Sequence, residues 1–90
     1  MPTVKFTYAL KRFFPGLKDI PAKSVVLSDI LTEIENYYPG IGSYILDEQG
    51  NLRRHVNIFI NGAMIPDRTN LNNTVAEKSD IHIIQALSGG

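Results

Sequence analysis

Few side chains in this sequence have the type and spacing that chemistry at a site requires. The chain contains no cysteine, and its two histidines, His55 and His82, lie far apart in the sequence. These facts exclude disulfides, thiolate zinc sites and cysteine nucleophiles, and they argue against a metal site. The glycines of "GIGSY" follow a predicted helix and do not open one, unlike a phosphate-binding loop. Because no Ser/His/Asp arrangement stands out either, we predict that the chain is not an enzyme.

The sequence ends in "ALSGG", with two successive glycines, Gly89 and Gly90, which raises the question of what such an end could do. Gly89 and Gly90 lack a Cβ atom, so this tail could pass through a narrow channel and allow close approach to its backbone. A free α-carboxyl group has a pKa of roughly 3.3–3.7 and is an anion at neutral pH. Carboxylate anions are poor electrophiles, so chemistry at this carbon needs prior activation. The plain alternative is an idle end, because chain ends fray unless something holds them.

Composition limits the classes of protein that could carry such a tail. Ninety residues make one domain, and 43% of them are hydrophobic, which is enough for one core. The formal net charge is +0, whereas a nucleic-acid-binding protein is normally basic. No apolar run approaches the roughly 18 residues of a membrane span, and "MPTVKFTYAL" does not resemble a signal peptide. We therefore expect a cytoplasmic monomer with no nucleic-acid or membrane partner.

The first third of the chain predicts two strands and a turn. Residues 3–10 alternate between apolar and polar side chains, which is typical of a half-buried strand. Pro15 and Gly16 indicate a turn, and residues 17–22 could return antiparallel as a second strand. Pro21 has no N–H group, so this second strand should lie at an edge of the sheet.

One amphipathic helix is predicted within "SVVLSDILTEIENYYPG". Its apolar residues recur with helical spacing and form one stripe: Leu27, Ile30, Leu31, Ile34 and Tyr38. Ser24 is the expected N-cap, because its hydroxyl could accept a hydrogen bond from a free backbone N–H. Ser28 is the rival start, one turn later. The Pro39-Gly40 pair should end the helix.

The second half of the chain reads as strands joined by turns. "HVNIFING" alternates, and Asn61-Gly62 is a strong hairpin signal leading to a short return strand at 63–65. Gly50-Asn51 indicates another turn, Leu71 and Val75 are the expected core anchors of the polar loop, and "IHIIQAL" predicts the last strand. The order is ββαβββ, and one amphipathic helix must cover a sheet face to bury its stripe.

This order predicts an α+β fold of the β-grasp, or ubiquitin-like, type. We expect a mixed sheet of four to five strands packed on one main helix, with the first and last strands parallel in its middle. The β-grasp domain should span 1–86, and 87–90 should form a flexible tail.

The predicted sheet has one face turned away from the helix. Val56, Ile58 and Ile60 on one strand, with Ile81 and Ile83 on the last, should face the helix. Phe59, His82 and Ile84 should then lie on the outer face, with Phe59 and Ile84 exposed as part of a partner surface. Scattered surface hydrophobes are the alternative.

The basic pairs Lys11-Arg12 and Arg53-Arg54 could bind in an acidic groove of a partner. We favour the alternative that they are ordinary solvated charges, because exposed pairs contribute little.

These features together resemble the ThiS/MoaD family of small sulfur carriers. The resemblance is carried by the β-grasp order, "VNIFING" before a polar loop, "SDIHIIQAL" as last strand and the terminal Gly-Gly. "ENYYPGI", "LRRHVNIFIN" and "ALSGG" are most similar to the family's carrier for cysteine biosynthesis. One departure is residues 17–22, which with Pro21 look less like a regular strand.

The resemblance implies a carrier and a set of partners. A ubiquitin-activating-like adenylyltransferase would use ATP to adenylate Gly90, and a sulfur donor would convert the adenylate to a thiocarboxylate. Leu87, Ser88 and Gly89 would bind in that partner, and the chain itself would hold no cofactor. Since the chain has no cysteine, any sulfur it carries must sit on the main-chain terminus.

The sequence leaves open which pathway receives the sulfur and to which functional class the protein belongs. The acceptor enzyme could be a pyridoxal-phosphate cysteine synthase, our first choice, followed by a peptidase that releases the product. Synthesis of molybdopterin or of the thiamin thiazole are alternatives. The tail would equally suit a covalent protein modifier joined through Gly90, and a plain interaction module would leave the tail idle.

Overall fold

A mixed sheet organises the protein, whose structure is a computed structural model that describes residues 1–85. The sheet has five strands in the order β2-β1-β5-β3-β4. Its elements, in chain order, are β1 (Thr3–Phe6), α1 (Tyr8–Phe13), β2 (Ile20–Pro21), α2 (Leu27–Tyr37), α3 (Gly42–Ile45), β3 (Val56–Ile60), β4 (Ala63–Met64) and β5 (Asp80–Gln85). The central strands β1 and β5 run parallel, whereas the other pairings are antiparallel. The predicted β-grasp arrangement, with first and last strands parallel in the middle, is therefore confirmed.

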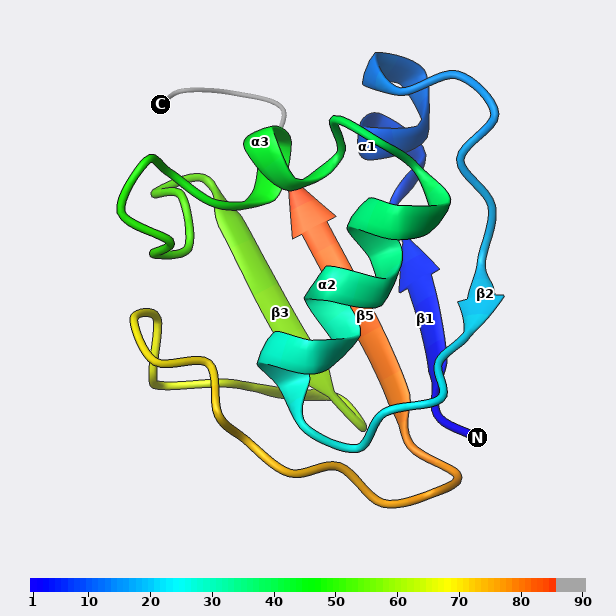
Figure 1. Ribbon diagram of the computed structural model, residues 1–90, viewed down its shortest axis with the longest axis vertical. Coiled ribbons are helices and arrows are strands. Elements are labelled where there is room, and N and C mark those ends of the chain that lie inside the picture. Colours follow the sequence, from blue (N-terminus) through cyan, green and yellow to red (C-terminus); the bar gives the residue numbers. More distant parts are fainter. Residues whose placement is uncertain (86–90) are drawn as a thin grey trace.

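The helix α2 crosses one face of this sheet (Figure 1). Its apolar stripe is buried at Leu27, Ile30, Leu31 and Ile34, as its helical spacing predicts. The sheet contributes fully buried side chains from alternate positions, including Ile58, Ile81 and Ile83. The predicted loop anchors Leu71 and Val75 are also buried in this core.

The predicted strand over residues 3–10 is wrong beyond Phe6. The chain leaves β1 there and forms α1, which the sequence pattern missed. Leu10 is fully buried, but Tyr8, expected on the same strand face, is 78% exposed. Leu10 and Phe14, the residue after α1, are four residues apart and both pack on the core, which is a helical spacing that extends beyond the alternating stretch.

The second strand is shorter than the predicted residues 17–22. β2 contains only Ile20 and Pro21, and it lies at the edge of the sheet as the missing N–H of proline required. Beyond this short pairing, the Asp19 carboxylate accepts the Phe6 N–H at 3.1 Å. A side chain therefore takes over the role of a strand partner at this end of β1.

Neither predicted serine caps the main helix. α2 begins at Leu27 after an N-cap at Val26, which makes no side-chain cap hydrogen bond. Val26 forms a β-bridge with Thr74, and the Leu27 N–H donates to the carbonyl oxygen of Asn73. The chain stays extended to Val26 because a distant loop supplies this acceptor. The predicted end before Pro39-Gly40 is confirmed, since α2 stops at Tyr37.

The turns follow the sequence signals closely. Asn61 and Gly62 have φ values of 51° and 84°, as a two-residue hairpin of type I′ requires. The return strand β4 ends one residue short of the predicted range. The turn at Gly50-Asn51 is also present, within an excursion closed by a bridge between Leu46 and Leu52.

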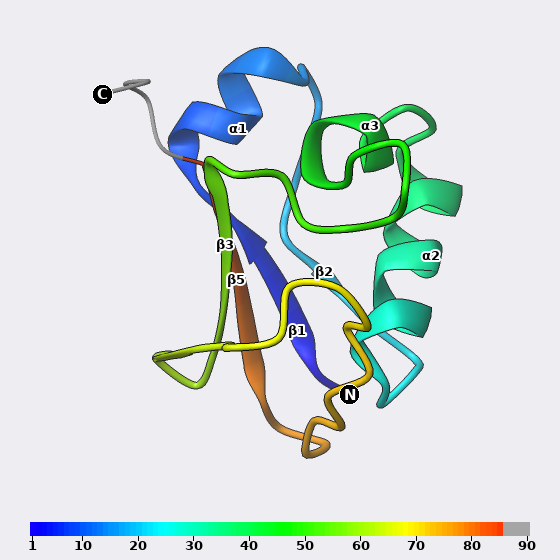
Figure 2. The same ribbon diagram turned by 90° about the vertical axis from the view of Figure 1, so that its left-hand side faces the viewer.

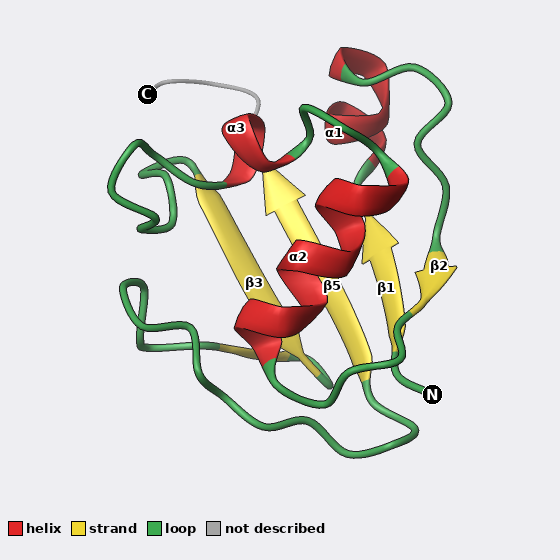
Figure 3. Ribbon diagram, viewed as in Figure 1, coloured by secondary structure: helices red, strands yellow, loops and turns green. Residues whose placement is uncertain are grey.

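The short helix α3 after the main helix was not predicted (Figure 3). Gly42 opens it, so the glycines of "GIGSY" do more than follow a helix. The Glu35 carboxylate on α2 accepts the N–H groups of Gly40 and Gly42, each at 2.7 Å. A Cβ atom at residue 42 would lie 2.7 Å from a carboxylate oxygen of Glu35, so a side chain there would have to displace this carboxylate.

Candidate functional site

The predicted reactive tail lies outside the described residues. Leu87, Ser88, Gly89 and Gly90 all fall beyond Gln85, the last residue that the structure describes. What the structure does describe is the strand that leads to them. Gln85 ends β5, pairs with Val56 on β3, and donates its N–H to the Thr7 hydroxyl at 3.5 Å. The tail therefore continues from a central strand that is held on both sides.

The predicted partner surface lies on the outer sheet face. Figure 2 shows α2 and α3 on one side of β1, β5 and β3, and within residues 1–85 no helix lies across the middle of the opposite side. Ile81 and Ile83 are buried toward the helix, so the intervening His82 and the following Ile84 project to the outer face. Phe59 alternates in the same way between the inward-facing Ile58 and Ile60.

Strand register brings the outer-face residues together. His82 lies directly opposite Phe59 on β3 and opposite Lys5 on β1. Phe59 in turn lies opposite Met64 on β4. Directly opposed side chains in a sheet have Cβ atoms about 4.5–5.5 Å apart, so these four residues form one row across the sheet. Ile84 is the diagonal neighbour of Phe59, because it pairs with Asn57.

We call Phe59, Met64, His82 and Ile84 the outer apolar face. Phe59 and Ile84 are half-buried and not exposed as predicted, because each lies among neighbours on adjacent strands. Ile60, expected in the core, is also only half-buried. Met64 is 56% exposed and was missed by the sequence reasoning. The two-residue turn at Asn61-Gly62 fixes the register that puts it opposite Phe59, so the signal was present.

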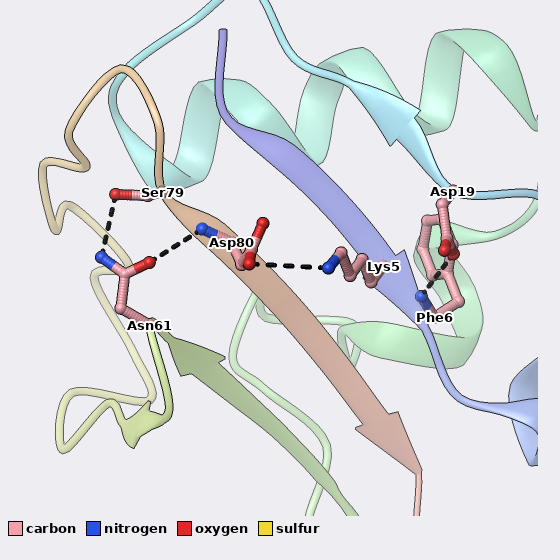
Figure 4. Close-up of polar contacts among 6 residues, drawn as sticks. All are labelled: Lys5, Phe6, Asp19, Asn61, Ser79 and Asp80. Carbon is pink, nitrogen blue, oxygen red and sulfur yellow. Dashed lines mark hydrogen bonds and ion pairs between the residues drawn. The ribbon is translucent and has the colours of Figure 1, made fainter.

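Polar contacts border the outer apolar face and hold its strands in register (Figure 4). Lys5 Nζ lies 3.5 Å from the Asp80 carboxylate across β1 and β5. The Asn61 side chain donates to Ser79 Oγ at 3.2 Å and accepts the Asp80 N–H at 2.9 Å. The hairpin turn that places Met64 is therefore tied directly to the start of β5.

The carboxylates with shifted pKa values lie elsewhere and stabilise turns. Backbone N–H groups of Gly40 and Gly42 lower the pKa of Glu35, and those of Thr69 and Asn70 lower the pKa of Asp67. Burial tends to raise the pKa of Glu33, but hydrogen bonds from Ser24 and Lys23 outweigh this and lower it. Because hydrogen bonds to the ionised form explain all three, we assign them structural roles.

No metal site emerges from residues 1–85, which contain no cluster of three or more His, Cys, Asp or Glu side chains suited to an ion. A groove of about 600 Å³ lies on the helix side, lined by residues of α2, α3 and the excursion. Its Glu35 and Asp47 carboxylates already accept backbone N–H groups. In the part of the chain described, no helix is long and apolar enough to cross a bilayer.

Comparison with known proteins agrees with this geometry. The ThiS family model matches residues 5–90. Sulfur carrier protein CysO of Mycobacterium tuberculosis is 28% identical over 90 residues, covering 98% of this chain and 97% of CysO. The crystal structure of that CysO has a TM-score of 0.80 at 26% identity, covering 97% of this chain and 100% of CysO.

Two further solved structures have the same fold. A chain of the Amycolatopsis orientalis BexX/CysO complex superposes with a TM-score of 0.82 at 24% identity, covering 100% of both chains. Small archaeal modifier protein 1 of Methanosarcina acetivorans superposes with a TM-score of 0.77 at 26% identity, covering 99% of this chain and 95% of the modifier.

The sheet order, the main helix α2 across one face and these neighbours define a ubiquitin-like β-grasp protein. Within that class the match is more specific, because it runs along nearly the whole sequence and through its last residue. The chain belongs to the ThiS family of sulfur carriers.

Proposed function

We propose that this protein carries sulfur as a thiocarboxylate on Gly90 and donates it in a biosynthetic pathway. The observation that carries the proposal is the family match through Gly90, together with a central strand, β5, that leads directly into the tail. An acyl group that must enter another enzyme's active site needs a rigid domain to carry it and a narrow end without side chains. The β-grasp domain is the rigid part, and Gly89 and Gly90 form the narrow end.

The chemistry divides into two substitutions. The Gly90 carboxylate attacks the α-phosphorus of ATP and releases pyrophosphate, which leaves an acyl-adenylate. A hydrosulfide or protein persulfide donor then attacks the acyl carbon, and AMP departs with the electron pair of the broken C–O bond. If a persulfide is the donor, a second thiol must reduce the resulting disulfide. The product sulfur is nucleophilic, as thiolates are. The protein is the substrate in both steps, and ATP binds to the activating partner.

The outer apolar face is proposed as the docking surface for the activating enzyme. Phe59, Met64 and Ile84 offer an aromatic ring, a flexible thioether and a branched aliphatic side chain, and aromatic residues and methionine are enriched at the centres of interfaces. His82 lies directly opposite Phe59 in the same row of the sheet. His82 and Ile84 of this surface lie on β5, the strand that leads into the tail. Docking of the outer apolar face would therefore direct the tail toward the partner.

Cysteine synthesis is our first choice of pathway, because the sequence is similar to CysO over nearly the full length of both chains. A pyridoxal-phosphate cysteine synthase would then accept the sulfur, and a peptidase would release the new residue from Gly90. The likeness to small archaeal modifier protein 1 favours one second candidate, attachment of Gly90 to lysines of other proteins.

Reconstitution with an activating enzyme from the source cell tests the proposal. The full chain is incubated with that enzyme, ATP and sulfide, and intact-protein mass spectrometry follows the replacement of one terminal oxygen by sulfur. A chain lacking Gly90 is the matched control and should stay unmodified. The proposal would be contradicted if the full chain stayed unmodified while the same enzyme preparation formed an acyl-adenylate on another carrier protein. High-mass ladders on denaturing gels of cell extract would instead support the modifier.

A further inference from the structure

Two basic pairs that are distant in the sequence lie at the same end of the sheet. Arg54 lies two residues before Val56, which opens β3 and pairs with Gln85 at the end of β5. On the other side of β5, Thr7 accepts the Gln85 N–H and α1 follows, with Lys11 and Arg12 in its last turn. Figure 2 shows α1 and the upper end of β3 on the two sides of the point where β5 ends.

Two of these four cations are already committed to the domain itself. Lys11 Nζ lies 3.3 Å from the Asp19 carboxylate. Arg53 is half-buried, and its Nε donates to the Ser43 carbonyl oxygen at 2.7 Å. Arg12 and Arg54 are exposed, and among residues 1–85 neither forms an ion pair. Of these four cations, the two without such a contact are therefore one arginine on each side of β5.

Chain length determines what these arginines could meet. Five residues, 86–90, follow Gln85, and a fully extended chain spans at most about 3.3–3.6 Å per residue. A tail threaded into an enzyme would place its reacting carbon roughly 17 Å beyond the end of β5. Arg12 and Arg54 would then lie at the mouth of the channel, against the enzyme surface, and not beside the reacting carboxylate.

From this placement we infer that Arg12 and Arg54 form a basic collar that docks on acidic side chains at the mouth of the activating enzyme's tail channel. This inference rests on the proposed function. Guanidinium groups pair with carboxylates through two parallel hydrogen bonds. Charges at the rim of an interface act mainly on the association rate and make it sensitive to salt.

Charge reversal at the collar provides the test. Pyrophosphate exchange by the activating enzyme of the reconstitution is measured with the wild-type chain and with R12E/R54E. At about 50 mM salt, where screening is weak, the double variant should lose roughly tenfold or more in kcat/KM. At saturating carrier its kcat should be unchanged, and at about 500 mM salt the difference should shrink.

K78E is the control. Like each substitution in the collar it replaces one positive charge by one negative charge, but it lies near the start of β5, at the opposite end of that strand. Lys78 is exposed in the turn before β5 and should change kcat/KM less than twofold. R12A/R54A, which removes charge without reversing it, should give an intermediate loss, and thermal unfolding checks that all variants fold. A double variant within twofold of wild type, or an equal loss for K78E, would overturn the collar. Absence of exchange with the wild-type chain would overturn the proposed function, and the collar with it.

Discussion

Met64 and Asn61 decide the character of the outer apolar face at the scale of single residues. Asn61 turns the chain with a positive φ and ties that turn to Ser79 and Asp80. The resulting register places Met64 opposite Phe59, where its long flexible side chain is largely exposed. An exposed apolar side chain next to an aromatic one is a common feature of docking sites, so Met64 can be tested without disturbing the core.

A charge at Met64 should weaken activation. Met64→Glu puts a carboxylate in the middle of the proposed interface, where it would be desolvated on docking. We expect kcat/KM for pyrophosphate exchange to fall about tenfold or more. Val25→Glu is the matched control, because Val25 is 50% exposed but precedes α2, away from this face. Equal effects of the two substitutions would show that the outer apolar face is not the docking surface.

Gly62 should be sensitive to any side chain. Its φ of 84° lies in the left-handed region, which costs an L-residue about 1 kcal/mol. Gly62→Ala should therefore lower the free energy of unfolding by about 1 kcal/mol in urea titrations. Asn72→Ala, at an exposed loop position, should change it by less than about 0.5 kcal/mol. An unchanged stability for Gly62→Ala would mean that this turn relaxes freely.

At the scale of elements, junctions between helices depend on carboxylates. Glu35 joins the end of α2 to α3 through two backbone N–H groups, which lower its pKa. A pKa that is lower in the folded than in the unfolded state contributes stability above the unfolded value, about 4.3 for glutamate. That contribution is lost as the pH falls through the folded value.

Glu35→Gln should reduce stability at pH 7 and weaken its dependence on acid. The amide can accept only one of the two hydrogen bonds through its oxygen, because its nitrogen is a donor. Urea midpoints measured from pH 7 to pH 3 should therefore fall less steeply for this variant than for wild type. Glu48→Gln, exposed in the excursion, serves as the control. Parallel acid profiles for wild type and Glu35→Gln would contradict the assigned role.

The elements also show which parts of this fold are readable from local patterns. Strand alternation predicted β3 and β5, and Asn61-Gly62 predicted the hairpin, because these signals are contained in a few neighbouring residues. The start of α2 was not readable, since its first N–H is satisfied by Asn73 from a distant loop. The helix α1 was missed because its apolar residues also fit a strand. The outer face was predicted from alternation, and Met64 needed only the hairpin register.

At the scale of the whole molecule, we propose that the core and the reactive end have separate roles. The core lies between the sheet and α2, and β5 is the strand that leads from it toward Gly90 in the sequence. Ile58→Ala deletes a fully buried side chain and should cost about 2–5 kcal/mol of unfolding free energy. At a temperature where the variant remains folded, its kcat for pyrophosphate exchange should match wild type. A large loss in kcat from the folded variant would argue against a carrier that only presents its end.

The most direct measurement is the intact mass of the protein isolated from its native cell. A sulfur carrier predicts a fraction of molecules in which sulfur replaces one oxygen, with fragmentation placing the exchange at Gly90. Addition of the activating enzyme, ATP and sulfide should raise that fraction. If every molecule carried the plain carboxylate at Gly90, both before and after that addition, the proposal of a sulfur carrier would be contradicted.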